Sequence, residues 1–170
     1  MKKFKSLLMG LVLAVLLAAC TSAETEELIE YHNGFVDLWE EKGEEMDVLA
    51  QEAMNLTSIE EVYELERDEF LPIVDEIVEF VTSQSPDSDV ALEYHGMRDE
   101  QVQVWSEAVY ADFELLEQLA NGEITEEESF ELYEDVEVLY IEAEQLMMEA
   151  DDKIEELSEE HDFTLEEIEE

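Results

Sequence analysis

Two of the three histidines in this sequence lie in near-identical short stretches, residues 30–34 (EYHNG) and 93–96 (EYHG). Imidazole and carboxylate ligands together suit zinc, copper, nickel or iron. If the helices that carry these stretches run parallel, His32 and His95 lie near one end and differ in height by about 6 Å. The pattern therefore suggests the hypothesis of a metal site in which His32 and His95 bind a divalent cation. The acids expected at that level are Glu76, Glu79, Asp151 and Asp152.

The alternative is that the two stretches are similar helix beginnings, each with a histidine satisfied by one hydrogen bond. The Glu-x-x-His spacing of di-iron bundles is missing, because Ile29, Leu92 and Ser158 occupy the positions where its glutamates would stand. The apolar register continues past Gly34, which favours an unbroken helix with a closely approaching neighbour over a helix stop. The sequence favours this structural interpretation over the metal site.

Other chemistry has little support in the residue pattern. The serines lie in no nucleophile elbow, and no glycine-rich loop is present that could hold a phosphate. Paired carboxylates can cleave glycosidic bonds, but a chain with 51 acidic residues contains such pairs by composition alone. We therefore expect a protein that is not an enzyme.

The first residues have the pattern of an export signal. Three lysines among residues 1–5 precede an apolar run at residues 7–19, which ends at Cys20. As a helix this run spans about 20 Å, which is too short for a hydrocarbon core of about 30 Å. Residues 1–19 are therefore expected to be a signal peptide rather than a membrane span.

Residues 17–20, Leu-Ala-Ala-Cys, resemble the lipobox of bacterial lipoproteins. The resemblance implies lipidation of Cys20 by a thioether-linked diacylglycerol, with attachment to the extracytoplasmic face of the cell membrane. Cys20 is the only cysteine, so no disulfide can form within the chain. Residues 20–24 are then a short tether, and two or more acyl chains give a stable anchor.

The charge is strongly unbalanced. The chain has 51 acidic and 7 basic residues, and removal of the signal leaves only Lys42, Arg67, Arg98 and Lys153. Nucleic acid is excluded as a partner, because its binding depends on lysine and arginine replacing phosphate counterions. The favoured partners are cations and basic or envelope proteins. The two arginines begin matching Arg-Asp-Glu stretches, and each is expected to pair with nearby carboxylates.

Apolar residues recur at helical spacing in four segments, at about residues 24–54, 58–81, 88–120 and 125–160. Ser58 with Glu61 and Thr125 with Glu128 fit capping boxes, and residues 121–122 (Asn-Gly) fit a helix stop. Pro72 predicts a kink near residues 70–71. In the last segment the inward stripe is expected at Phe130, Tyr133, Val136, Tyr140, Ala143, Met147, Ala150, Ile154 and Leu157.

Amphipathic helices joined by short loops bury their stripes together, which predicts an all-α, up-down-up-down four-helix bundle at residues 25–160. A three-helix bundle is the alternative. Residues 161–170 are expected to form an acidic tail.

The region 105–150 contains a long helix, the stretch Asn-Gly-Glu-Ile-Thr-Glu-Glu at residues 121–127, and another acidic helix. It resembles the cell-wall-binding helical lipoproteins of Gram-positive bacteria, which implies a surface lipoprotein associated with the cell envelope. The functional hypothesis is a membrane-anchored, non-enzymatic helical domain for protein interaction. The alternative is a cation- or metal-binding lipoprotein.

Overall fold

The computed structural model describes residues 22–165, and all the regular elements within them are helical. They form four long segments whose bounds lie within two residues of those predicted, which confirms the all-α four-helix bundle. The segments are α2 (Ala23–Ala53), the interrupted run of α3 (Ile59–Leu65), η1 (Glu66–Phe70) and α4 (Leu71–Ser83), then α5 (Asp89–Ala120) and α6 (Glu126–His161).

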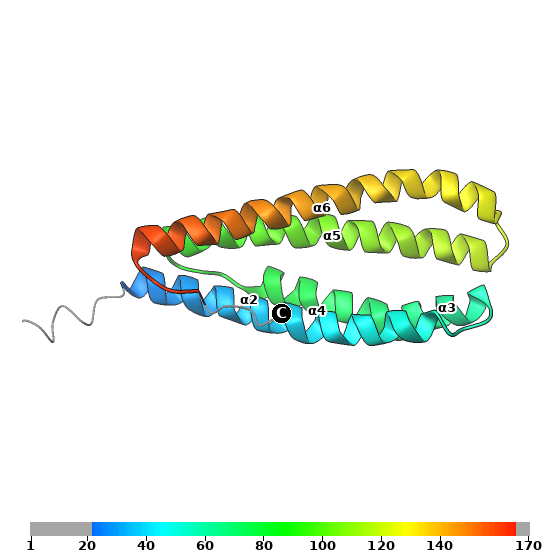
Figure 1. Cartoon of the computed structure of the whole chain (residues 1–170), viewed down its shortest axis with the longest axis horizontal. Helices are drawn as coiled ribbons and strands as arrows, with labels where there is room; N and C mark the ends of the chain where they lie inside the picture. Colours follow the sequence, from blue (N-terminus) through cyan, green and yellow to red (C-terminus); the bar gives the residue numbers. More distant parts are fainter. Residues whose placement is uncertain (1–21, 166–170) are drawn as a thin grey trace, which may run out of the picture.

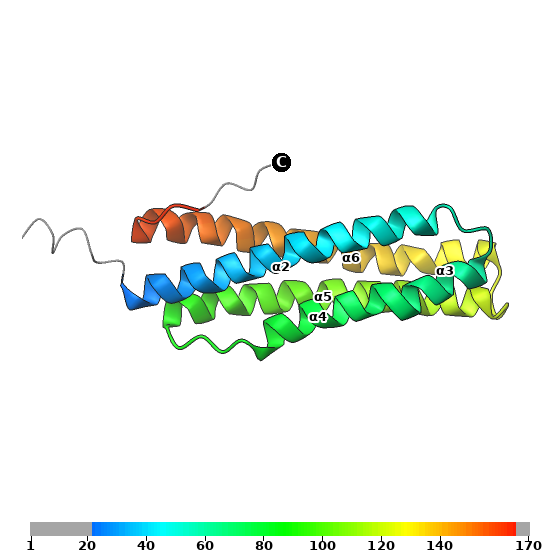
Figure 2. The same cartoon turned by 90° about the horizontal axis from the view of Figure 1, so that it is seen from below.

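The segments alternate in direction and form two layers (Figures 1 and 2). In Figure 1, α5 and α6 lie in the upper layer, with α2 and the α3–α4 run beneath them. The start of α2 and the end of α6 share one end of the bundle, and the α2–α3 and α5–α6 turns share the other. We call the first the near end and the second the far end. α2 and α5 therefore run parallel, as the histidine hypothesis required.

Local signals explain the helix boundaries. The hydroxyls of Ser58 and Thr125 accept hydrogen bonds from the backbone N–H groups of Glu61 and Glu128. Each of these glutamates bonds back to the backbone of its cap residue, so both predicted capping boxes are confirmed. After α5 the chain turns at Gly122, whose φ of +69° is readily adopted only by glycine.

The core has two connected parts. At the near end, residues of α2, α5 and α6 pack around Leu28, Tyr94 and Ile154. Further along, residues of α2, α4 and α5 pack around Phe35, Ile77 and Val102. α6 makes most of its close backbone contacts with α5 and few with α2. The backbones of α2 and α6 therefore approach each other less closely than those of α5 and α6.

The second segment changes its helical geometry just before Pro72. Residues 66–70 form a π-helical turn, and the backbone N–H of Leu71 donates to the carbonyl of Glu66, five residues earlier. A proline inside a regular α-helix would clash with the carbonyl four residues before it. The wider turn relieves that clash, so the distortion predicted near residues 70–71 is present as a π-turn.

Within residues 22–165, no helix combines the length and the apolar character needed to cross a membrane. The predicted signal peptide and the lipidation of Cys20 lie outside the described residues, as does the end of the predicted acidic tail.

Candidate functional site

The two EYH stretches meet at the near end and interlock. His32 Nδ1 lies 2.8 Å from the hydroxyl of Tyr94, and His95 Nδ1 lies 3.0 Å from the hydroxyl of Tyr31. Each tyrosine thus contacts the histidine of the other stretch. The two tyrosine rings also pack edge to face, with centroids 5.9 Å apart. The repeated sequence is a reciprocal junction between α2 and α5.

Arg98 takes part in the hydrogen bonding of Tyr94 at this junction. Its Nε donates to the Tyr94 hydroxyl over 2.8 Å, so that oxygen is an acceptor there. The hydroxyl proton of Tyr94 is then free to be donated to a neutral His32. Burial first, and then the nearby positive charge of Arg98, lower the pKa of His32, which keeps the ring neutral at neutral pH.

Arg98 is a buried charge with every side of its guanidinium occupied. Besides Tyr94, it donates to Gln101 over 2.9 Å and forms a short ion pair with Asp151 of α6. Its carbon also lies 4.7 Å from the centroid of the Phe35 ring, within cation–π range. With only 3% of its surface exposed, Arg98 joins α5 to α2 and α6 rather than offering a clamp for a ligand.

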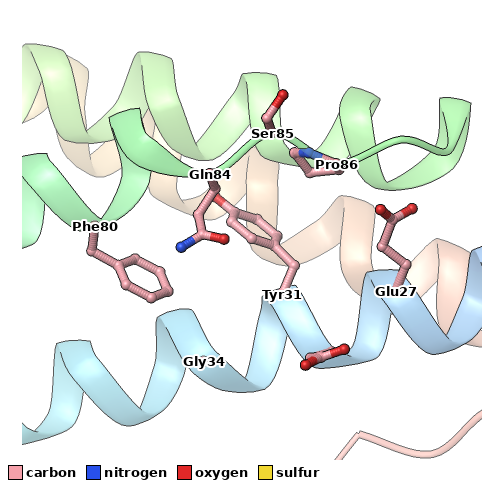
Figure 3. Close-up of a pocket in the computed structure, with 8 residues that line it drawn as sticks. Glu27, Tyr31, Gly34, Phe80, Gln84, Ser85 and Pro86 are labelled. Carbon is pink, nitrogen blue, oxygen red and sulfur yellow. The ribbon is translucent and has the colours of Figure 1, made fainter.

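A hollow of about 410 Å³ lies beside Tyr31, where α4 ends before reaching the near end. In Figure 3, Tyr31 and Glu27 rise from α2 toward the connection that carries Gln84, Ser85 and Pro86. The Glu27 carboxylate accepts from the backbone N–H groups of residues 87 and 88 at 2.7 and 2.9 Å, which lowers its pKa. Glu27 therefore holds the connection between α4 and α5 in place. Its carboxylate lines the hollow but already has two backbone partners.

The two glycines of the repeated stretches differ. A methyl group on Gly34 would lie 3.4 Å from the Phe80 ring, so the expected close neighbour is present there. A methyl group on Gly96 would meet no atom of the described residues within 4 Å. Gly96 faces outward on α5 because no helix covers this side of it. Both glycines lie inside unbroken helices, as predicted.

A second hollow, of about 250 Å³, opens between α5 and α6 at the far end. We call it the far-end groove, and its apolar walls are Leu115, Leu116, Leu119, Phe130 and Tyr133. The sequence predicted Phe130 and Tyr133 to be buried, and this is wrong. They are 76% and 40% exposed, because few contacts join α2 to α6 and no other helix lies over this part of α6.

Two half-buried carboxyls, on η1 and α5, lie close enough to influence each other toward the far end of the bundle. Burial first, and then the nearby carboxylate of Asp112 on α5, raise the pKa of Glu66 in η1 to about 7. Burial also raises the pKa of Asp112. Burial first, and then nearby acidic groups that include Asp112 and Glu66, raise the pKa of Tyr140 of α6 as well. Nothing in the sequence marked these two acids out among the many others, since only the packing of three helices buries them.

The four basic residues of the described chain are all ion-paired. Lys42 of α2 contacts Glu76 of α4 at 2.7 Å, and Lys153 of α6 contacts Glu93 of α5 at 3.1 Å. With the Arg98–Asp151 pair, three of the four bases connect neighbouring helices. Arg67 pairs with the adjacent Asp68, so it alone behaves as its local sequence suggests. The exterior of residues 22–165 therefore offers carboxylates without a free lysine or arginine.

Each of the two histidines predicted as metal ligands has a tyrosine as its hydrogen-bond partner. Within the described part of the chain, no group of three or more histidine or acidic side chains is arranged to hold a metal ion. Of the acids expected at that level, Asp151 pairs with Arg98 and Glu76 with Lys42. The metal site at His32 and His95 stays a prediction. The sequence did not lead us to predict the tyrosines as partners of the histidines. Their position directly before each histidine could have indicated it.

Comparisons with protein-family models, with curated proteins and with solved structures found no match to this chain.

Proposed function

We propose that this protein is a lipid-anchored, non-enzymatic helical domain that binds a basic protein partner outside the cell membrane. The observation that carries the proposal is the use of the basic side chains. All four in the described chain are ion-paired and three join helices, so the charge left for a partner is carried by carboxylates. Such a surface attracts basic proteins and speeds their association.

The bundle also suits presentation away from a membrane. A lipid on Cys20 would attach three residues before the start of α2, at the near end. α2 has 31 residues, and a helix of that length extends about 45 Å. An anchored chain could therefore present its far end to partners at that distance from the point of attachment.

The anchor is tested by expressing the full chain with Cys20→Ser in a bacterium that processes lipoproteins. We expect the unaltered chain in the membrane fraction with a diacylglycerol on Cys20 by mass spectrometry, and the variant in the soluble extracytoplasmic fraction. Ser22→Ala, two residues away, is the matched control and should stay with the membrane. An unmodified Cys20 in the unaltered chain would contradict the anchor.

The partner is tested with a carbodiimide, which joins carboxylates directly to lysine amines in contact with them. On intact cells that express the chain, we expect a discrete adduct with one other protein that disappears in molar salt, because salt screens the attraction. A smear of adducts that changes with any added basic protein would count against a specific partner.

A further inference from the structure

We propose that the far-end groove binds a basic, amphipathic helix of the partner protein. The inference rests on the proposed function and names the surface and the chemistry of its partner. The groove lies where α5 ends and α6 begins, at the end of the bundle opposite the start of α2.

The groove is apolar in its walls and open to one side. Three leucines of α5 form one wall, while Phe130 and Tyr133 rise from the first turns of α6. Phe130 is the most exposed aromatic side chain among the exposed large apolar residues of the described chain, with 76% of its surface accessible. An aromatic side chain beside a leucine-lined hollow is the usual form of an anchor point in a helix-binding groove.

The rim of the groove is acidic. On α6, residues three and four positions from Phe130 are its neighbours on the helix surface, and these include Glu126, Glu127 and Glu134, all exposed. Asp112 lies at the inner end of the groove. No lysine, arginine or histidine occurs between Arg98 and Lys153, so the part of the α5–α6 hairpin around the groove, residues 99–152, lacks basic residues.

Charge complementarity selects the occupant. A second copy of this chain would bring an identical acidic rim against the first, and like charges in contact oppose association. The groove instead fits a helix that has lysine or arginine on its flanks and leucine or another apolar residue facing the groove. The basic residues would pair with the acidic rim, and the apolar residues would pack against the apolar walls. The apolar anchors of such a helix would recur at i, i+3 or i+4 and i+7, which is the usual spacing of a helix that binds in a groove.

The test uses a fluorescein-labelled peptide of about 18 leucine and lysine residues, with leucines at helical spacing. Fluorescence anisotropy measures its binding to residues 21–170 and to Phe130→Asp. We expect the substitution to weaken binding by about tenfold or more, because it removes the apolar anchor. The matched control is Leu92→Asp, which adds the same charge at an exposed apolar position near the other end of α5.

Both variants gain one negative charge, so attraction by charge alone predicts that both bind a basic peptide slightly more tightly. Weaker binding by Phe130→Asp and nearly unchanged binding by Leu92→Asp would support the groove. Equal binding by the two would overturn it and leave the acidic surface intact. No binding of the lysine peptide to the unaltered chain would remove the proposed function as well. Circular dichroism checks the fold, and Tyr133→Ser supplies a second groove variant.

Discussion

The hydroxyl of Tyr94 is the central atom of the junction between α2 and α5. It accepts a hydrogen bond from Arg98 and lies within hydrogen-bond distance of His32, and its ring is fully buried. Within residues 22–165 the Tyr31 hydroxyl has only His95 as its partner, and His95 is partly exposed. The two stretches are alike in sequence, but we expect their tyrosines to contribute unequally to the free energy of unfolding. Of the two hydroxyls, only that of Tyr94 is bonded to the buried charge of Arg98.

Replacement of these tyrosines by phenylalanine tests the inequality. Tyr94→Phe leaves Arg98 Nε and His32 Nδ1 without their partner, and a buried polar group left unsatisfied costs about 1–3 kcal/mol. Tyr31→Phe should cost less, since water can reach His95. Urea denaturation of both variants measures the difference in the free energy of unfolding. Equal losses would show that Tyr94 has no special role at the junction.

The interrupted second segment shows how one element can carry both a distortion and a titrating group. The π-turn at residues 66–70 accommodates Pro72, and the same turn carries Glu66. Burial and the facing carboxylate of Asp112 hold the Glu66 pKa near 7, above its ordinary value of 4.5. The native state therefore retains a proton that the unfolded state releases across this pH range.

This proton makes part of the stability depend on pH. The contribution of Glu66 is fully present below about pH 4.5 and is lost as the pH rises to about 7, because ionisation then buries a charge and places it near the carboxylate of Asp112. We expect Glu66→Gln to be more stable than the unaltered chain at pH 8, by roughly 1 kcal/mol, since water partly screens the pair. Urea titrations from pH 5 to 8 measure this. Glu69→Gln, an exposed neighbour, is the control, and parallel stability curves for Glu66→Gln and the unaltered chain would refute the assignment.

At the scale of the whole molecule, repulsion among carboxylates opposes a fold held by apolar seams. The chain has 51 acids against 7 bases, and the four bases of the described part are used at specific pairs. These pairs join α2 to α4 and α5 to α6, but no ion pair in residues 22–165 joins α2 to α6. That seam is also the one with few backbone contacts.

Salt should therefore stabilise this protein. The screening length falls from about 30 Å at 0.01 M to about 3 Å at 1 M, which weakens the repulsion between exposed carboxylates. The midpoint of thermal unfolding, followed by circular dichroism on residues 21–170, should rise as sodium chloride increases over this range. Sucrose at equal osmolality is the control for general solvent effects. An unchanged or falling midpoint would mean that the ion pairs outweigh the repulsion.

The sequence by itself determined the helices, their caps and their alternating order. Apolar periodicity, the Ser58 and Thr125 capping boxes and the stop at Gly122 act within a few residues, so they can be read without knowing the neighbours. Tertiary structure alone decided that Arg98 pairs with Asp151, that each tyrosine meets the other stretch's histidine, and that Phe130 is exposed. Those outcomes depend on which helices lie side by side and where they separate, and a helical stripe has the same spacing whether or not another helix covers it.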